Sequence, residues 1–494
     1  MHRRTFCKNA LATGVAVALP GCGKEAGTAA SRPQKSSTLA AISRTGSEVT
    51  IDSSIVRDFA AALQGPLLQS TDSGYDSARK LWNGMIDKHP ALIARCQSAA
   101  DVVQAVNFAS EQDLLLAVKC GGHSFPGKSS CDGGLMIDLG NMHSVDVDTE
   151  AMTARVDGGA LLGHIDVATN AHNLGTTTGI VSHTGAGGFT LGGGYGRTDR
   201  LMGLAVDNLL AANIVSANGE VLRASESDNP DLYWAIRGGG GNFGVATEFV
   251  YRLHPFNPAI YGGTVIFDLT TDFLVGYSAL AAELPNEANI EPYIFVDTDG
   301  SRKVTVEVVY AGDHATGEQV MASLLKLANP QSVELGAMEY RKLQTSADAA
   351  LGPGKQYYLK SGLVTEISPG LAEVIVDHMN RDDPVTCWGE HLGGMPANVA
   401  PDAMAYSHRN AALNLGIMVV SEDPAAMDAQ IAKAREFYQD ASPYMIGFYT
   451  NLNEASEKKT RGNYGDNYPR LVKAKNKYDP RNLFHLNSNI KPSV

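Results

Sequence analysis

The sequence predicts an α+β protein of two lobes. Its 494 residues are too many for one ordinary domain and suit two large ones. Up to about residue 255, short apolar runs of strand length alternate with glycine-rich loops. Beyond this point the apolar residues recur at strand and helix spacing over longer elements. This pattern of longer strands and helices is typical of an antiparallel sheet backed by helices.

The first residues predict an export signal. Arg3 and Arg4 precede an apolar run at 10–19, which is about half as long as a membrane-spanning helix. The arginine pair resembles the twin-arginine signal, which carries folded proteins across a membrane. A buried N-terminal helix is the alternative. We therefore expect an exported, periplasmic or secreted protein of a bacterium.

The segment after the apolar run has two further features. Leu19-Pro-Gly-Cys22 resembles a lipoprotein cleavage box, which leaves a lipid anchor at Cys22 as an open alternative. Residues 23–50 are rich in Ala, Ser, Thr and Gly and show no packing face. Residues 1–50 are therefore expected to form a signal and a flexible tether.

Residues 54–255 are predicted to form the first lobe. Apolar runs at 114–119 and 135–139 predict two strands that flank a loop containing His123. The other elements expected here are a helix at 160–172, a hairpin turning at Asn218-Gly219 and a strand at 245–253.

Residues 256–462 are predicted to form the second lobe. Asp299-Gly300 between two alternating runs predicts a hairpin. Helical patterns occur at 314–328, 371–381 and 424–439, and β runs at 413–420 and 444–451. From 463 the chain turns polar and aromatic, with an amphipathic helix at 468–478. We expect residues 463–494 to return to the first lobe and complete it.

Charge and cysteine content limit the partners. The net charge of −13 offers no cluster of cations for nucleic acid, so a small-molecule partner is favoured. No CxxC pair is present, and no metal site is expected. Cys120 and Cys131 could form a disulfide, but free thiols are an equally good interpretation of the four cysteines beyond the signal.

Four glycine clusters indicate a phosphate-bearing ligand. Consecutive glycines let backbone N–H groups approach an anion closely, which suits a pyrophosphate. No GxxxxGK[ST] motif is present, and no cluster lies in a strand–GxGxxG–helix unit, which disfavours a P-loop or nicotinamide enzyme. The clusters are Cys120-Gly-Gly-His-Ser124, Gly185-Ala-Gly-Gly188, Gly192-Gly-Gly-Tyr-Gly196 and Gly238-Gly-Gly-Gly-Asn-Phe-Gly244.

These clusters, in this order, resemble the FAD-binding domain (PCMH type) of the vanillyl-alcohol-oxidase superfamily, and within it the berberine bridge enzyme-like oxidases. The resemblance extends to Gly203-Leu-Ala-Val-Asp-Asn208 and, near the C-terminus, to Asn463-Tyr-Gly-Asp-Asn-Tyr-Pro-Arg-Leu471 and Tyr478-Asp-Pro-Arg-Asn-Leu-Phe484. It covers about 90–494. The resemblance implies a two-lobe FAD-linked oxidase, with the pyrophosphate between 118–127 and 182–196.

The resemblance also implies a set of cofactor-binding residues, with His123 bonded to the flavin 8α-methyl. Lys119 stands where the family more often has arginine. A second, cysteinyl bond occurs in some members, but that position is Val181 here, so a single attachment is expected. The expected FAD contacts are His123, Lys119, Cys120, Gly121, Gly122, Ser124, Thr184, Gly185, Gly188, Gly192, Asp207, Asn208, Asn242, Gly244, Val245, Asn487 and Asn489.

The catalytic base is less clearly indicated. Relatives often carry a second tyrosine where Tyr449-Thr-Asn-Leu452 has Leu452, and a leucine cannot accept a proton. The candidates are Tyr449, Tyr464, Glu390, His391 and His408.

The predicted function is oxidation of a small alcohol, sugar or related substrate by hydride transfer to a covalently bound flavin, which oxygen or another acceptor reoxidises. The sequence leaves two alternatives open. One is a dehydrogenase with an acceptor other than oxygen. The other is a flavin-loaded binding protein that lost its base, which the leucine at 452 suggests.

Overall fold

The predicted strands around His123 belong to a small sheet with a parallel centre. The computed structural model describes residues 37–454 and 456–493, so the predicted export signal lies outside the described residues. β4 (Leu92–Arg95) and β5 (Leu116–Lys119) pair in parallel with β6 (Leu135–Asp138), and β3 (Leu67–Leu68) adds an antiparallel edge. All four residues of β6 are buried, as expected for a parallel strand covered on both faces. Both strand predictions are confirmed.

A second, antiparallel sheet follows. Its order is β11 (Val221–Ser225), β10 (Leu209–Val215), β12 (Val245–Arg252), β8 (Thr153–Asp157) and β7 (Val145–Asp148). The predicted hairpin between β10 and β11 is confirmed, and Gly219 takes the positive φ of 74° that its turn requires. The predicted helix is α4 (Leu162–Asn170), and the two-residue strands β9 (Leu174–Gly175) and β13 (His254–Pro255) pair beside it.

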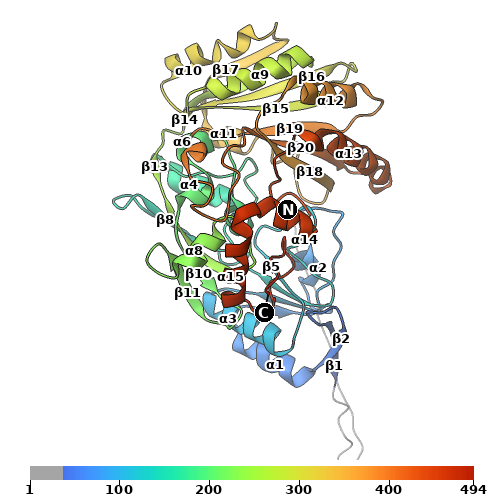
Figure 1. The fold of residues 1–494 in the computed structure, drawn as a ribbon. Coiled ribbons are helices and arrows are strands. Elements are labelled where there is room, and N and C mark those ends of the chain that lie inside the picture. Colours follow the sequence, from blue (N-terminus) through green and yellow to red (C-terminus); the bar gives the residue numbers. More distant parts are fainter. Residues whose placement is uncertain (1–36, 455, 494) are drawn as a thin grey trace, which may run out of the picture. The chain divides into compact units, whose positions relative to one another are not determined.

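The second lobe is a seven-stranded antiparallel sheet with helices on one face (Figure 1). The predicted hairpin at Gly300 joins its two central strands. The strands, in sheet order, are β17 (Ser332–Glu339), β14 (Ala259–Asp268), β16 (Arg302–Tyr310), β15 (Ala288–Val296), β19 (Thr386–His391), β20 (Leu413–Ser421) and β18 (Gln356–Val364).

The covering helices are α9 (Thr271–Glu283), α10 (His314–Met321), α12 (Pro369–Asn380) and α13 (Met427–Ala441). The last three confirm the predicted helical patterns. Local chemistry sets their starts: the Ser368 hydroxyl accepts the Leu371 amide, and Pro369 occupies the first position of α12. The predicted β run at 444–451 is wrong. It forms a 3₁₀ turn, Ser442–Tyr444, and then an irregular segment with a single bridge between Gly447 and Leu363.

Short helices connect these sheets. They are α1 (Ser53–Ala62), α2 (Tyr75–Arg79), α3 (Ala99–Glu111), α5 (Ala186–Gly192), α6 (Asp199–Met202), α7 (Ala205–Asn208), α8 (Pro230–Ile236), α11 (Tyr340–Gln344), α14 (Glu457–Tyr464) and α15 (Tyr468–Tyr478). Further 3₁₀ turns are Leu324–Lys326, Met395–Asn398, Pro424–Ala426 and Gly465–Asn467. No helix of the described part is long and apolar enough to cross a membrane.

The tether prediction is wrong for its last residues. β1 (Thr38–Ile42) and β2 (Glu48–Asp52) form a hairpin whose turn contains Gly46 at a φ of 88°. Ala41 and Ile51 point inward and belong to the core beneath β4 and α3. The alternation of Thr38-Leu-Ala-Ala-Ile42 supplies this buried face, which composition alone did not reveal.

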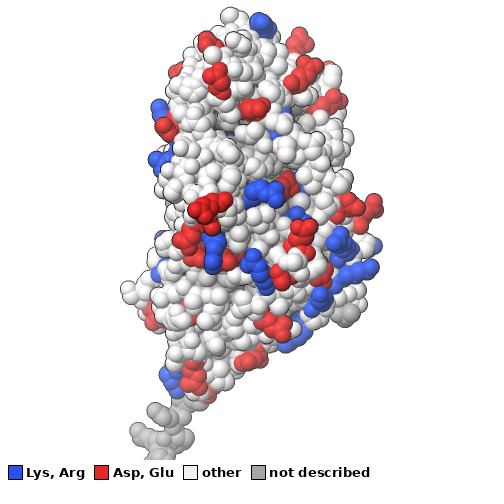
Figure 2. All heavy atoms as spheres, turned by 90° about the vertical axis from the view of Figure 1, so that its left-hand side faces the viewer, with Lys and Arg blue, Asp and Glu red and all other residues white. Residues whose placement is uncertain are grey.

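The four cysteines of the described chain are free, so Cys120 and Cys131 are not paired. On the face shown in Figure 2, acidic and basic side chains are intermixed.

The C-terminal residues return to the first lobe, where α15 packs against α8. The predicted helix at 468–478 is confirmed as α15. On its buried side, Lys475 is fully buried and donates to the Asn242 carbonyl, the Asp479 carboxylate and the Phe484 carbonyl at 2.8, 2.6 and 3.0 Å. The hydrogen bond from Lys475 to the Asn242 carbonyl therefore joins the C-terminal segment to the glycine loop that ends at Gly244, while the ion pair with Asp479 lies within the C-terminal segment.

We expect Lys475→Ala to lower the free energy of unfolding by about 3–5 kcal/mol, because it leaves the Asp479 carboxylate buried without its partner. Lys477→Ala on the same helix removes an exposed pair with Asp231 and should cost less than about 1 kcal/mol. Thermal unfolding of both variants measures the difference. Equal, small losses would show that the buried pair does not hold this segment.

Candidate active site

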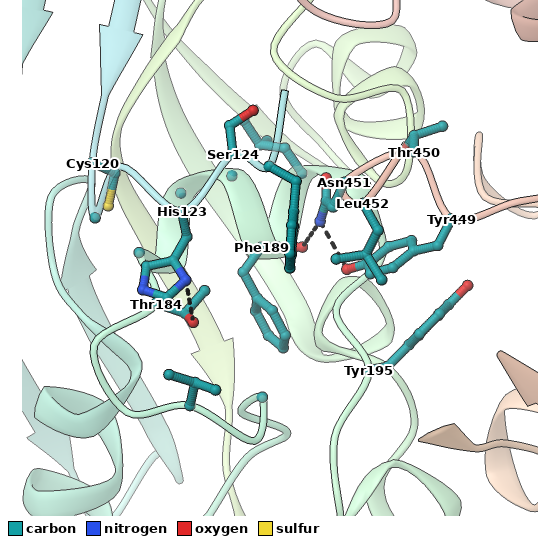
Figure 3. A pocket seen from close by; sticks show the side chains of 18 of the residues that line it. Cys120, His123, Ser124, Thr184, Phe189, Tyr195, Tyr449, Thr450, Asn451 and Leu452 are labelled. Carbon is teal, nitrogen blue, oxygen red and sulfur yellow. Dashed lines mark hydrogen bonds between the residues drawn. The ribbon is translucent and has the colours of Figure 1, made fainter. Parts of the chain in front are cut away.

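A large cavity lies between the loops of the first lobe and the seven-stranded sheet. Its volume is about 720 Å³, within the range of small-molecule and cofactor sites. Residues from the glycine clusters, from five strands of the sheet and from the C-terminal segment line it. Figure 3 shows His123 and Tyr449 at the same cavity, although they are far apart in the sequence.

Two glycine loops meet backbone to backbone on the wall of the cavity. A Cβ atom at Gly121 would lie 2.4 Å from the Gly185 nitrogen, and one at Gly185 would lie 2.3 Å from the Gly121 nitrogen. Any side chain at either position would push the loops apart. Glycine is therefore required by close approach, and Gly122 is required in addition by its positive φ of 70°.

Other glycines leave open space instead. A Cβ atom at Gly188 would meet nothing within 4 Å, and one at Gly240 would only approach Asn242 at 3.8 Å. Both glycines line the cavity, so their missing side chains add to its volume and expose backbone to a ligand. Asn242 fixes the second of these loops, because its amide donates to the Gly239 and Ser488 carbonyls at 2.8 and 3.1 Å.

His123 is held between aromatic rings and a second histidine. Trp82 stacks on the imidazole with ring centroids 4.6 Å apart, and the Nε2 atom of His123 lies 2.6 Å from the Nδ1 atom of His183. The hydroxyl of Thr184 lies 3.4 Å from its Nδ1 (Figure 3). Burial, and then the charge of His183, lower the pKa of His123 to about 3. The imidazole is therefore neutral at physiological pH.

The cavity face of the seven-stranded sheet carries a row of polar side chains. In the antiparallel register Glu291 lies opposite Glu307, and Glu390 lies opposite Asn414. Tyr293 pairs with Trp388, and extending this register by two residues along each strand places Glu291 opposite Glu390. We name Glu307, Glu291 and Glu390 the glutamate row; all three line the cavity.

Glu390 and His391, both candidates for the base, lie on opposite faces of β19. Glu390 lines the cavity, and its carboxylate accepts the amide of Asn414 at 2.7 Å. Burial raises the pKa of Glu390 to about 7. His391 faces the helices, with Nε2 3.1 Å from the Ala281 carbonyl and Nδ1 3.3 Å from the Ile290 nitrogen. Adjacent strand residues point to opposite faces, so these two cannot share one cavity.

The two candidate tyrosines line the cavity, but their hydroxyls are engaged. The hydroxyl of Tyr449 accepts the Gly194 amide at 3.0 Å and the Asn451 side-chain amide at 2.7 Å. The hydroxyl of Tyr464 donates to the Gly238 carbonyl at 3.0 Å. Burial, with the charge of Glu390 for Tyr449, raises the pKa of both phenols. His408 does not line the cavity and pairs with the Asn463 side chain at 3.0 Å.

Most of the predicted cofactor contacts line the cavity, namely His123, Cys120, Gly121, Gly122, Ser124, Thr184, Gly185, Gly188, Asn242, Gly244, Val245 and Asn487. Five do not. The Lys119 amine turns away to the Ala78 carbonyl and Asp138, and Asp207 pairs with Arg409 at 2.8 Å. Asn208 caps the turn after Met202, Gly192 lies against the Asn451 side chain, and Asn489 lies outside the lining.

The structure adds residues that the sequence analysis missed. Trp82 and His183 contact His123, and the buried Lys128 amine reaches the cavity from the same loop. The alternation of β15 and β16 could have indicated Glu291 and Glu307, since each lies beside apolar residues that face the helices and therefore points to the opposite face of the sheet. The contacts of Trp82, by contrast, come from a loop with no recognisable pattern.

Glycine-built loops and a neutral histidine at one cavity are the features of a protein that can bind a phosphate-bearing cofactor. Family comparison identifies that cofactor as FAD: residues 90–225 match the FAD binding domain and residues 448–491 match the berberine and berberine-like family. The chain is 33% identical to an FAD-linked oxidoreductase of Dictyostelium discoideum over 89% of this chain and 97% of that protein. It is 30% identical to the (R)-6-hydroxynicotine oxidase of Paenarthrobacter nicotinovorans, over 87% and 97%.

Solved structures agree. The 6-hydroxy-D-nicotine oxidase of Arthrobacter nicotinovorans superposes with a TM-score of 0.80 at 28% identity, covering 87% of this chain and 98% of that one. A berberine bridge enzyme-like protein of Physcomitrella patens shares the fold with a TM-score of 0.81 at 23% identity, covering 88% and 99%. The chain belongs to the berberine bridge enzyme-like FAD-linked oxidoreductases, and the predicted fold class is confirmed.

The residues present fit FAD. The Gly188 and Gly240 positions form a cradle that side chains would fill, and the cavity of about 720 Å³ has the size for such a cofactor. The lining residues of the 120–124, 184–188 and 239–245 loops would hold it, with Asn487 closing the site. The sheet face opposite these loops is left for the substrate.

The raised pKa of Glu390 predicts a pH-dependent effect on stability. A folded-state pKa near 7 against about 4.3 in the unfolded chain destabilises the fold as pH rises through this interval. Glu390→Gln should therefore stabilise the protein by up to about 3 kcal/mol at pH 8 and by less than about 1 kcal/mol at pH 5. Thermal unfolding at the two pH values measures it. An equal shift at both would contradict the raised pKa.

Proposed function

We propose that this FAD-linked oxidoreductase is an oxidase of a small alcohol, sugar or related substrate, with its flavin attached through one histidyl bond at His123. The observation that carries the proposal is that one cavity joins His123 and the glycine loops to a buried carboxylate, Glu390, with a pKa of about 7. When bound, the flavin accepts a hydride equivalent and passes the electrons to oxygen or another acceptor.

His123 is suited to covalent attachment by its neutrality. Its lowered pKa keeps a ring nitrogen unprotonated and nucleophilic at physiological pH. The 2.6 Å contact with His183 gives the ring a neighbour that can take its remaining proton, and Trp82 fixes the ring plane. Val181 lines the cavity where some relatives carry a second, cysteinyl attachment, which supports a single bond.

Among the candidate bases the geometry favours Glu390. A base is most effective when its pKa lies near the working pH, and Glu390 meets this condition, whereas burial raises the pKa of the Tyr449 phenol. Asn414 orients the carboxylate at 2.7 Å. In this assignment Glu390 takes the hydroxyl proton of the substrate while the carbon gives up its hydride. Leu452 is then no obstacle to catalysis, because the proton acceptor is on the sheet.

The substrate class is supported by relatives. A chitooligosaccharide oxidase shares the fold with a TM-score of 0.80 at 24% identity, and the nicotine oxidases act on a small nitrogen-containing molecule according to their names. For location, we propose export through the arginine pair at Arg3 and Arg4, with lipid attachment at Cys22 as the alternative to release.

His123→Ala should abolish covalent flavin. After acid precipitation we expect a yellow pellet from the native protein and a colourless one from the variant, with the FAD mass on the native peptide that contains His123. Cys120→Ala, a change in the same loop, should keep the yellow pellet. Release of all flavin from the native protein would contradict covalent attachment but not FAD binding.

Glu390→Gln should slow anaerobic flavin reduction by a saturating substrate by about 10²–10⁴, the usual contribution of a general base. Tyr449→Phe removes one hydroxyl that accepts two hydrogen bonds and should slow it by about tenfold or less. Stopped-flow bleaching of the flavin across alcohols, sugars and phenols measures both. The reverse ranking would assign the base to Tyr449.

A further inference from the structure

The glutamate row places three carboxylates side by side on adjacent strands. Residues directly opposite in an antiparallel pair have Cβ atoms about 4.5–5.5 Å apart, and like charges there are destabilising. Glu291 is the central member, with Glu307 on β16 and Glu390 on β19 as its two neighbours. Burying such a row is costly unless cations or hydrogen-bond donors lie beside it.

Among the described residues, Glu307 is the one member of the row with a direct ion-pair partner, although the charge of that partner, Arg197, also acts on Glu291 and Glu390. The guanidinium of Arg197 pairs with Glu307 and donates to the Gln344 side chain at 2.8 Å. Within residues 37–454 and 456–493, no ion pair includes Glu291 or Glu390. Glu390 at least accepts an amide hydrogen from Asn414. Glu291 therefore has no directly paired cation among these residues.

Glu291 also has an unmet hydrogen-bonding atom. The residue is 8% exposed and lines the cavity, and its Oε1 is buried with no hydrogen-bond partner. A buried carboxylate oxygen without a donor is costly. Burial raises the pKa of Glu291 well above its usual range, although the charge of Arg197 acts to lower it.

Aromatic side chains stand next to these carboxylates on the same sheet face. Tyr293 and Trp388 are cross-strand partners two residues along from Glu291 and Glu390, and both line the cavity. Phe295 extends the aromatic surface by one more step along β15. Carboxylate oxygens together with aromatic faces are the environment that binds an ammonium group through charge-assisted hydrogen bonds and cation–π contacts.

We infer that the substrate carries a protonated amino group, which Glu291 binds while the neighbouring Glu390 faces the group to be oxidised. The placement of the oxidised group at Glu390 rests on the proposed function, since it takes Glu390 as the base. The substrate class is therefore an amino alcohol or amino sugar. The substrate nitrogen then contacts Glu291 and the substrate hydroxyl contacts Glu390. The two strands that carry these carboxylates are about 4.8 Å apart.

Calorimetry on the flavin-loaded protein tests the cation site without turnover. The probes are tert-butylammonium chloride and tert-butanol, which have the same shape and no oxidisable C–H beside the heteroatom. We expect the ammonium to bind at least about tenfold more tightly than the alcohol, and Glu291→Gln to remove about 10- to 100-fold of that affinity, as for a hydrogen bond between charged groups. Equal binding of the two probes, or an unchanged preference in the variant, would overturn the inference.

The chain offers a matched control. Glu334 lies at the exposed edge of the same sheet, opposite Thr264 on β14 and outside the cavity lining. Glu334→Gln should leave both affinities unchanged. Glu291→Gln keeps the size and hydrogen-bonding atoms of the neutral acid, so retained tert-butanol affinity and thermal midpoint verify its fold. Loss of ammonium affinity in both variants would mean general electrostatic attraction and would also overturn the inference.

A second measurement separates this inference from the proposed oxidase function. Amino alcohols are compared with diols of the same carbon skeleton in anaerobic flavin reduction. Ammonium binding that depends on Glu291 without reduction by any substrate would uphold the cation site and count against the oxidase. Reduction by diols at least as efficient as by amino alcohols, without ammonium binding, would uphold the oxidase and overturn the cation site.

Discussion

The backbone contact between Gly121 and Gly185 is the constraint on which the cavity depends. A Cβ atom on Gly121 would lie 2.4 Å from the Gly185 nitrogen, and a Cβ atom on Gly185 would lie 2.3 Å from the Gly121 nitrogen, so either would clash with the other loop. Because these loops touch, His123 lies within 2.6 Å of His183, and the open positions at Gly188 and Gly240 face one enclosed space. The proposed covalent attachment and the expected pyrophosphate site therefore rest on the same close approach.

The alternation of the seven-stranded sheet supplies the other half of the site. Valine and isoleucine positions on β15 and β16 pack under the helices, so the residues between them must face the cavity. This one periodicity brings Glu291, Glu307 and Glu390 together and turns His391 away. The resulting carboxylates are unfavourable for the empty protein, and such local conflict is common where function requires it.

The C-terminal segment closes the site from a distance in sequence. Tyr464 and Asn487 reach the cavity because α15 packs against α8 and the buried Lys475 holds the Asn242 carbonyl. A fully buried ion pair is weak evidence of stability by itself, because desolvation offsets much of its attraction. Here the pair has a geometric role: Asp479 holds the Lys475 amine, and that amine donates to the Asn242 carbonyl of the glycine loop that borders the cavity.

The sequence determined those helices, strands and turns that depend on neighbouring residues along the chain. The strands beside His123, the Gly219 and Gly300 hairpins and helix α15 follow from apolar spacing and turn residues, and the glycine clusters with their order identify the FAD family. The hairpin from Thr38 was missed because the alternation of inward and outward residues on its first strand is short, and the buried residue there, Ala41, is small. The prediction for 444–451 failed because two of its apolar residues, Tyr444 and Ile446, are exposed, and the segment forms a bridge to a neighbouring strand at Gly447 instead of a ladder.

Tertiary structure alone decided which side chains share the cavity. Lys119 and Asp207 belong to the right motifs but turn to partners at Asp138 and Arg409. The glutamate row depends on the register of three strands, and that register is set by packing across the sheet. The sequence by itself therefore determined the cofactor class and most of its loops, because backbone approach requires glycine at given positions. Only the fold indicated the proposed base and the proposed cation site, because their residues meet through strand pairing and not through spacing along the chain.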